Sequence, residues 1–149
     1  MTVTIENIRQ FNRYYTRILG VFDKKVFNLD YSMIEMRILG EIARNKGTTA
    51  NHLAKFMRMD RSYLSRIVNK LEKVGYITRQ NDPADKRIFR LFLTDKGETL
   101  NSFIEEQSDK QILELLHSLD AEEITQLETA MGTIETILNQ VVPKEMEEM

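Results

Sequence analysis

The sequence of 149 residues contains no cysteine, only two prolines and six glycines, and no long uninterrupted apolar run. Without cysteine there is no disulfide and no sensing through a reactive thiol. No apolar run approaches the length that crosses a membrane, and the first residues, MTVTIENIRQ, lack the apolar centre of a signal peptide. We therefore expect a cytoplasmic protein with no membrane partner.

Motifs of catalysis and metal binding are also missing. The chain has no cysteine nucleophile, no glycine-rich phosphate loop, no HExxH motif and no supported Ser-His-Asp set. Its two histidines, His52 and His117, lie far apart, and no carboxylate completes a metal-ligand spacing around them. The sequence thus predicts no enzyme activity, no metal site and no cofactor.

Charge is unevenly distributed along the chain. Residues 1–43 carry net +1, residues 44–90 net +8 and residues 91–149 net −11, which together give the overall −2. A basic block of this kind is the electrostatic footprint of nucleic-acid binding, even though the isoelectric point near 5.8 is acidic. The acidic C-terminal third should face away from DNA.

Residues 60–74 read as a helix with two different faces. An apolar stripe at the three-four spacing of a buried helix face comprises Leu64, Ile67, Val68 and Leu71. The opposite face is short, polar and basic, with Ser62, Ser65, Arg66 and Asn69. Such side chains can donate to and accept from base edges in a major groove, although a solvated helix face would look the same.

A charged β-hairpin follows this helix. Gly75 ends the helix, residues 76–80 and 88–93 have strand character, and residues 81–85, NDPAD, are strong turn formers. Lys86 and Arg87 stand beside the turn. A basic hairpin tip next to a groove-reading helix is a wing, and an arginine there can enter a narrow minor groove.

At these residues the chain resembles the MarR family of winged helix-turn-helix transcriptional regulators. The matching residues are Asp60-Arg61-Ser62, Ser65-Arg66, Leu71-Glu72, Gly75-Tyr76-Ile77, Asp82-Pro83-Ala84-Asp85-Lys86-Arg87, Leu93-Thr94 and Gly97. The resemblance implies a homodimer that binds double-stranded, pseudo-palindromic operator DNA, more often as a repressor, and that a small aromatic or phenolic effector can release. It also implies that Arg87 is the minor-groove residue.

The expected fold is mainly α with a small β-hairpin wing: a winged helix-turn-helix with N- and C-terminal dimerisation helices. We expect one domain over residues 1–149, with the DNA-binding lobe at 32–94 and the dimerisation helices at 1–27 and 95–142. The helices should cover residues 5–26, 32–46, 49–57, 60–74, 95–119 and 120–141. A capping box is expected at Ser32 with Glu35 and another at Asp120 with Glu123.

Three sets of site residues follow from these patterns. The expected DNA contacts are Arg61, Ser62, Tyr63, Ser65, Arg66, Asn69, Lys70, Lys86 and Arg87. The expected effector contacts are Arg13, Tyr14, Arg17 and Met36, since arginines beside tyrosines suit an aromatic carboxylate. The expected dimerisation residues are Ile5, Ile8, Leu127, Met131, Ile134 and Leu138, the last four belonging to a seam of three- and four-residue steps that requires a partner helix.

One position departs from the family pattern. The turn between the third and fourth helices usually contains glycine in the family, and here the residue is Arg58. A left-handed backbone there would cost an arginine about 1 kcal/mol. Its side chain would then be available for a phosphate contact.

Two other functions remain open from the sequence. Residues 9–27 resemble the start of MarR-type domains fused to an acetyltransferase, which would require a further domain after the last helix. A dimerisation protein without DNA binding is the third alternative, and the basic block argues against it. The operator sequence, the target genes and the effector are not readable from the chain.

Overall fold

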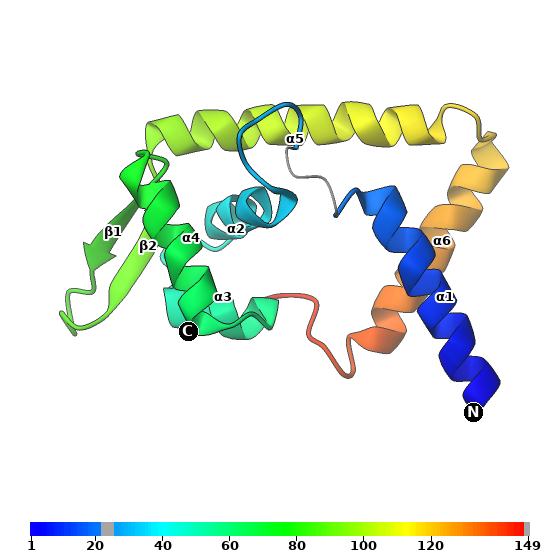
Figure 1. The fold of residues 1–149 in the computed structure, drawn as a ribbon, viewed down its shortest axis with the longest axis horizontal. Coiled ribbons are helices and arrows are strands. Elements are labelled where there is room, and N and C mark those ends of the chain that lie inside the picture. The colour runs from blue at the N-terminus through cyan, green and yellow to red at the C-terminus, as the bar shows by residue number, and fades with distance from the viewer. Residues whose placement is uncertain (22–25, 148–149) are drawn as a thin grey trace.

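The computed structural model describes residues 1–21 and 26–147. In these ranges the elements, in order, are α1 (Thr2–Leu19), α2 (Met33–Arg44), α3 (Ala50–Met57), α4 (Arg61–Lys73), β1 (Ile77–Asn81), β2 (Phe89–Leu93), α5 (Asp95–Leu116) and α6 (Ala121–Leu138). The expected class, mainly helical with a hairpin wing, is confirmed (Figure 1). None of the helices described is both long and apolar enough to cross a membrane.

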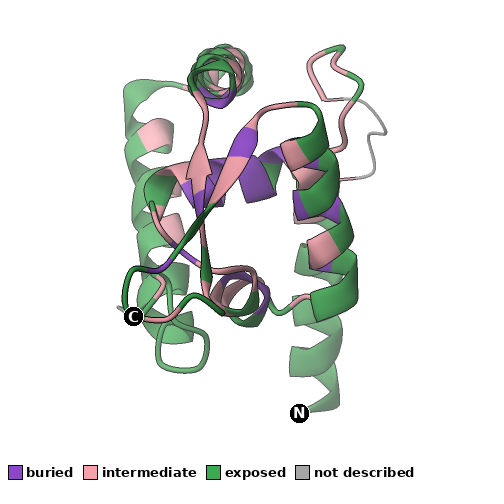
Figure 2. Ribbon diagram, turned by 90° about the vertical axis from the view of Figure 1, so that its left-hand side faces the viewer, coloured by how far each residue is buried: buried purple, intermediate pink, exposed green. Residues whose placement is uncertain are grey.

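The hydrophobic core lies between α2, α3, α4 and the hairpin. The stripe expected on α4 is buried there, and the largest fully buried side chains are Ile38, Leu39, Ile42, Leu53, Leu64, Val68, Leu71 and Leu91. In contrast, α1 and α6 bury no residue, as their exposed colouring in Figure 2 shows. The burial of apolar surface therefore stabilises the lobe that carries α4, and leaves the two terminal helices without a core of their own.

Most helix starts were readable from the sequence. The Asp60 carboxylate accepts from the Tyr63 backbone N–H at 2.9 Å, and Thr49 caps α3 in the same way through His52. The capping box of Asp120 with Glu123 is complete. These short-range bonds satisfy backbone donors that have no partner inside the helix.

The capping box expected at Ser32 forms only in half. The Ser32 hydroxyl accepts from the Glu35 backbone N–H at 3.2 Å, as expected. The Glu35 carboxylate does not return to the Ser32 backbone; it accepts from the Ser32 hydroxyl and from Lys70 on α4. A charged donor outcompetes a neutral backbone N–H for a carboxylate.

The first helix differs from the expected 5–26 at both ends. It begins at Thr2 and ends at Leu19, because Gly20 adopts a left-handed conformation with φ 71° and caps the last turn. Glycine reverses the backbone there at no steric cost. The expected continuation through Phe22 lies outside the described residues, and Val26 packs against the core of the lobe that carries α4.

The hairpin is held firmly to the start of α5. The Thr94 backbone N–H donates to the Tyr76 carbonyl at 3.0 Å, and Gly97 packs against that same carbonyl so closely that a Cβ would overlap it. Only glycine permits this approach. The wing and α5 consequently leave the core in a defined direction, with α5 running from the hairpin to the end of the molecule where α1 and α6 lie (Figure 1).

After α6 the chain returns to the lobe that carries α3 and α4 (Figure 1). Lys144 pairs with Glu135, Met146 packs against the core and lies 3.3 Å from the Thr48 hydroxyl, and the Glu147 carbonyl lies 3.0 Å from the His52 ring. His52 is thus half-buried, with its ring close to the Glu147 carbonyl. This segment links the last helix to α3.

Glu41 on α2 is a buried carboxylate with its partners at the surface. Its side chain is 7% exposed and accepts from Arg37 and Arg44, each at 2.8 Å. Burial by itself raises the pKa of Glu41, but the hydrogen bonds from Arg44 and Arg37 outweigh it and hold the pKa below its ordinary value. Glu41 is therefore charged at neutral pH and anchors α2.

Glu41→Gln should lower the free energy of unfolding at neutral pH by about 1–3 kcal/mol, since the bonds from Arg37 and Arg44 lose the negative charge on their acceptor. A carboxylate whose pKa is lower in the folded state stabilises the fold above its unfolded pKa, near 4.5, and loses that contribution as pH falls through the folded value. Urea unfolding across this range should show the gap between wild type and variant closing at acid pH. A gap that stays constant with pH would contradict this account.

Candidate nucleic-acid interface

The polar face of α4 projects away from the core, as the helix pattern predicted. Ser62, Arg66 and Asn69 are exposed and Ser65 is half-buried. The Arg66 guanidinium lies 5.8 Å from the centre of the Tyr63 ring, and no carboxylate among the described residues pairs with it. Arg66 is therefore free to meet a base or a phosphate, with the tyrosine ring supporting its side chain.

The wing tip is a rigid turn. One oxygen of Asp82 accepts from the backbone N–H groups of Ala84 and Asp85, at 2.8 and 3.1 Å. Its other oxygen accepts from Arg90 at 2.7 Å, and Arg90 also donates to the Gly47 carbonyl before α3. The hydrogen bond from Arg90, followed by those of the turn, lowers the pKa of Asp82. Asp82 and Arg90 thus join the wing to the loop between α2 and α3.

Arg87 extends from this turn into solvent. Its side chain is 89% exposed and makes two parallel bonds to Asp85, at 3.0 and 2.9 Å. These bonds lower the pKa of Asp85 and raise that of Arg87. Lys86, next to it, is exposed as well. The two-pronged pair fixes the direction of the guanidinium.

Lys70 is turned away from the polar face. Its ammonium binds the Glu35 carboxylate at 2.8 Å and lies 5.3 Å from the centre of the Tyr31 ring. Burial, and then the hydrogen bond with Tyr76, raise the pKa of Tyr31 to about 12, so this phenol is neutral. Lys70, among the expected DNA contacts, thus has its charge balanced by Glu35 and joins α4 to α2.

Two further arginines, Arg79 and Arg58, have defined places in the structure. Arg79 on β1 binds Glu72 and donates to the Asn69 side-chain oxygen at 2.7 Å. Arg58 ends α3 with φ 53°, the left-handed conformation foreseen for this position. Asn69 and Glu72 lie three residues apart on one edge of α4. This spacing was the feature of the sequence that could have indicated a shared partner such as Arg79.

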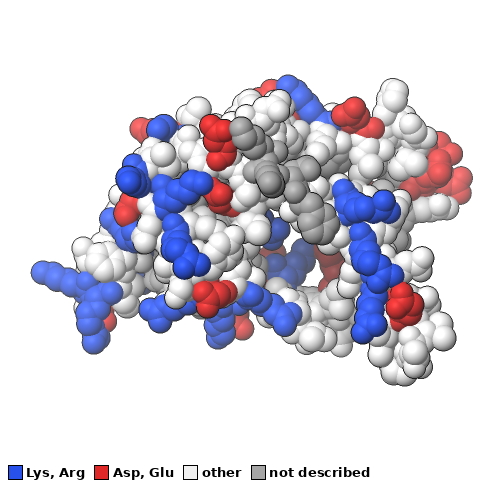
Figure 3. Space-filling view, viewed as in Figure 1, with Lys and Arg blue, Asp and Glu red and all other residues white. Residues whose placement is uncertain are grey.

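Basic side chains gather on the lobe that holds α4 and the hairpin. Figure 3 shows lysine and arginine over that lobe and extending from the wing, with acidic residues prominent at the far corner where α5 meets α6. The charge asymmetry read from the sequence is therefore also an asymmetry in space. An anionic partner would be steered to the end of the molecule that bears α4.

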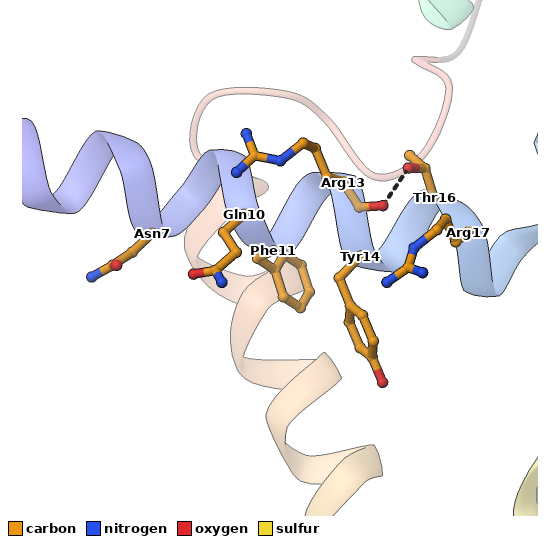
Figure 4. Close-up of a pocket in the computed structure, with 7 residues that line it drawn as sticks. All are labelled: Asn7, Gln10, Phe11, Arg13, Tyr14, Thr16 and Arg17. Atoms are coloured by element: carbon orange, nitrogen blue, oxygen red, sulfur yellow. Dashed lines mark hydrogen bonds between the residues drawn. The ribbon is translucent and has the colours of Figure 1, made fainter.

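A hollow of about 820 Å³ lies beside α1, lined by Asn7, Gln10, Phe11, Arg13, Tyr14, Thr16 and Arg17 (Figure 4). Tyr14 and Arg17 point to the same side, with the guanidinium 5.7 Å from the ring centre, whereas Arg13 turns away and pairs with Glu6 at 2.9 Å. Met36 is not at this hollow: it is 4% exposed in the core. The structure thus brings Tyr14 and Arg17 together and separates Met36 from them.

The apolar residues expected to mediate dimerisation are open to solvent in the single chain. On α1, Ile5 and Ile8 are 44% and 57% exposed, and on α6, Ile134 and Leu138 are 40% and 54% exposed. Leu127 and Met131 are half-buried. Within the described part of the chain, no three histidine, aspartate or glutamate side chains gather closely enough to hold a metal ion.

Comparison with known proteins identifies what this arrangement is similar to. The MarR family model matches residues 29–88. FabT of Streptococcus pneumoniae, crystallised in complex with DNA, superposes with a TM-score of 0.73 at 21% identity over 90% of this chain and 99% of FabT. The Multiple Antibiotic Resistance Repressor, MarR, superposes with a TM-score of 0.74 at 22% identity, over 85% of this chain and 92% of MarR. A mutant MarR from E. coli, complexed with operator DNA, superposes with a TM-score of 0.65 at 24% identity. The match covers 87% of this chain and 91% of the mutant MarR.

Proposed function

We propose that this chain is a DNA-binding transcriptional regulator of the MarR family, whose model matches residues 29–88, and that it represses transcription as a homodimer on a pseudo-palindromic operator. The observation that carries the proposal is the exposed face of α4, where Arg66 has no carboxylate partner among the described residues, next to a wing that presents Arg87. Regulators of this family act by binding and not by catalysis. The proposed site of action is the cytoplasm, where a regulator of this kind can bind operator DNA.

Each subunit is proposed to place α4 in a major groove and the wing tip in the flanking minor groove. The DNA contacts on α4 would be Arg61, Ser62, Tyr63, Ser65, Arg66 and Asn69, with Lys86 and Arg87 on the wing. Two half-sites should then lie one helical turn apart, roughly 34–36 Å between centres. Bound by two subunits across a promoter, the protein would exclude the transcription machinery.

Selection of bound sequences from a random DNA pool, followed by gel shifts at several salt concentrations, tests this function. The expected result is a palindromic site bound with a steep salt dependence, because each phosphate contact releases counterions. A dimeric protein that retains no DNA at low salt would instead be a dimerisation module. Acetyltransferase activity of the full-length protein would identify a regulatory domain related to the acetyltransferase fusions.

The Arg87→Ala variant should bind DNA less tightly while its thermal stability stays nearly unchanged, because the Arg87 side chain is 89% exposed and its ion pair with Asp85 lies at the surface. The slope of log affinity against log salt should become shallower by about 0.9 if one phosphate-equivalent charge is lost. The loss should be larger on sites with A·T-rich flanks than on G·C-rich ones, since a narrow minor groove attracts arginine most strongly.

Lys110→Ala is a suitable control for this wing prediction. Lys110 is an exposed cation on α5, remote in the fold from the hairpin, and its removal should leave the salt slope as it is. If Arg87→Ala matches the wild type in both affinity and slope, the wing does not touch DNA and α4 reads the operator alone.

The proposed dimer is built from the terminal helices. Their apolar side chains, exposed in one chain, form the natural surface for a second copy: Ile5 and Ile8 on α1, and Leu127, Met131, Ile134 and Leu138 on α6. Monomeric proteins rarely leave contiguous apolar faces of this size in water. We place the division between the DNA-binding lobe at 32–94 and the dimerisation helices at 1–27 and 95–142.

An aromatic or phenolic effector is proposed to bind beside α1. Tyr14 and Arg17 offer a ring face and a guanidinium on one side of the hollow, which suits a planar ligand bearing a carboxylate. Arg13 would join only by leaving Glu6, and Met36 does not line this hollow. Salicylate-type ligands, titrated against a wild-type operator complex and an Arg17→Ala complex, would test this assignment.

A further inference from the structure

The segment that follows α6 brings negative charge to α3. It covers residues 139–147 and runs back to the lobe that carries α3 and α4 (Figure 1). Its one basic residue, Lys144, is paired with Glu135 on α6. Glu145 and Glu147 are exposed, and neither has an ion-pair partner among the described residues. The segment therefore carries two uncompensated carboxylates to the place where it meets α3.

Two contacts hold this segment on the lobe. Met146 packs against the core, and its sulfur accepts a hydrogen bond from the Thr48 hydroxyl at 3.3 Å. Thr48 is only 3% exposed, so this contact reaches the buried edge of the lobe. The Glu147 carbonyl lies 3.0 Å from the ring nitrogen of His52, which must donate because a carbonyl only accepts. Neither contact uses a carboxylate, so both glutamate charges stay available to act on their surroundings.

A hollow of about 360 Å³ lies where the segment meets α3. Lys55 and Arg58 line it together with Glu145 and Glu147. Both cations are exposed, and neither forms an ion pair with any residue that the structure describes. Arg58 ends α3, three residues before Arg61, the first residue of α4. The hollow therefore places two available cations beside the start of the proposed reading helix.

The position of these cations suits contact with the DNA backbone. Basic side chains beside a reading helix bind phosphates and fix how the protein sits on the duplex. The carboxylates of the segment act against this, because charges within a Debye length of about 8–10 Å are not fully screened at physiological salt. A phosphate on Lys55 or Arg58 would meet two like charges, which is unfavourable. The segment and the DNA backbone thus compete for the same surface of α3.

We propose that Lys55 and Arg58 form a phosphate-binding site on α3, and that residues 145–147 cover it in the free protein and leave it when DNA binds. The proposal rests on the proposed function, because it assumes that α4 enters a major groove. It adds a backbone contact outside α4 and the wing, and an acidic segment of the same chain that competes with it. The segment lowers affinity for every DNA sequence alike, since phosphates carry no sequence information.

Neutralising the two carboxylates in the full-length protein tests the competition. Glu145→Gln/Glu147→Gln should bind operator and random DNA about three- to tenfold more tightly, the size expected for two surface charge pairs. The slope of log affinity against log salt should become steeper, by about 0.9 for each phosphate contact regained. Gel shifts at several salt concentrations give both quantities. Glu114→Gln/Glu128→Gln removes the same charge from exposed positions on α5 and α6, and should change neither.

Removing the cations tests whether they are the site that the segment covers. In a Lys55→Met/Arg58→Met protein, adding the same two glutamine changes should alter DNA affinity by less than about twofold, because no phosphate contact is left to regain. A gain as large as in the wild-type background would mean that the carboxylates act on other cations of the lobe.

Releasing the segment while keeping its charges provides a second route. Met146→Ser removes the packing against the core, so this protein should also bind DNA more tightly, with thermal unfolding as the check that it is folded. The ¹³C-methyl signal of Met146, identified by its absence in Met146→Leu, reports the segment directly. On addition of operator it should narrow and move to the position of a solvent-exposed methionine. The glutamine variants keep Met146 and test the proposal even if Met146→Ser does not fold.

Three results would overturn the inference and leave the proposed function standing. They are an unchanged affinity and salt slope in Glu145→Gln/Glu147→Gln, an equal gain in the Glu114→Gln/Glu128→Gln control, and a Met146 signal that stays in place when operator saturates the protein. In each case the wild type still binds its operator. A wild type that retains no DNA at low salt would remove the proposed function and this inference together.

Discussion

Ile134→Asp is expected to convert the proposed dimer into monomer or insoluble protein and to abolish tight operator binding. Ile134 lies on α6 in a seam with Leu127, Met131 and Leu138, and it is 40% exposed in the single chain. In a dimer this position would be covered by the partner, and an aspartate there would be buried without a counter-charge. Such a burial costs several kcal/mol.

The loss of DNA binding follows from the loss of the second subunit. With two linked reading helices, the second half-site is bound as an intramolecular step, which raises affinity by about 10²- to 10⁴-fold over a single half-site. Sedimentation would give the oligomeric state, and a gel shift on a full operator against a half-site would give the affinities. The variant should treat the two DNAs almost alike.

Thr133→Asp is the matched control, because it introduces the same charge one residue away on an exposed position that only bonds back to its own helix. This control should remain a dimer. A folded dimer of the Ile134→Asp protein with normal operator affinity would remove the α6 seam from the interface.

The Arg66→Ala variant is expected to lose its preference for the operator while keeping part of its affinity for random DNA. Arg66 is exposed at the centre of the polar face of α4 and has no carboxylate partner among the described residues. An arginine that reads guanine with two parallel hydrogen bonds contributes about 1–3 kcal/mol of discrimination. The ratio of operator to non-specific affinity should fall correspondingly, by about 5- to 150-fold.

Arg66→Lys separates charge from shape. Lysine keeps the positive charge but lacks the planar fork, so non-specific binding should persist while discrimination drops. Competition gel shifts with operator and scrambled DNA provide the ratio for each protein. Equal weakening on both DNAs in Arg66→Ala would make Arg66 a phosphate contact only.

Features that depend on neighbours in the sequence were determined by the sequence itself. The buried stripe of α4, the caps at Thr49 and Asp60, the Gly75 helix stop and the turn at Asp82 all follow from residues within a few positions of one another. The alternation of faces, the hairpin and the clustering of positive charge are likewise local. The MarR family model matches residues 29–88, which include most of the residues that carry the resemblance.

Features that join distant residues were decided only by the tertiary structure. The sequence did not show that Lys70 would bind Glu35, that Arg79 would hold Asn69, or that the segment after α6 would reach Thr48. The sequence also did not show that Met36 is buried in the core, whereas Tyr14 on α1 is exposed. Each of these depends on which elements lie side by side and on how far a flexible side chain reaches between them.

The reason is physical. Helix caps, turns and amphipathic faces are set by backbone geometry and by hydrogen bonds that span three or four residues, so composition and spacing are sufficient to predict them. A long charged side chain can instead pair with any carboxylate or amide that packing brings within reach. In this protein α4 packs against α2 and β1. As a result Lys70 forms an ion pair with Glu35 on α2, and Asn69 accepts a hydrogen bond from Arg79 on β1.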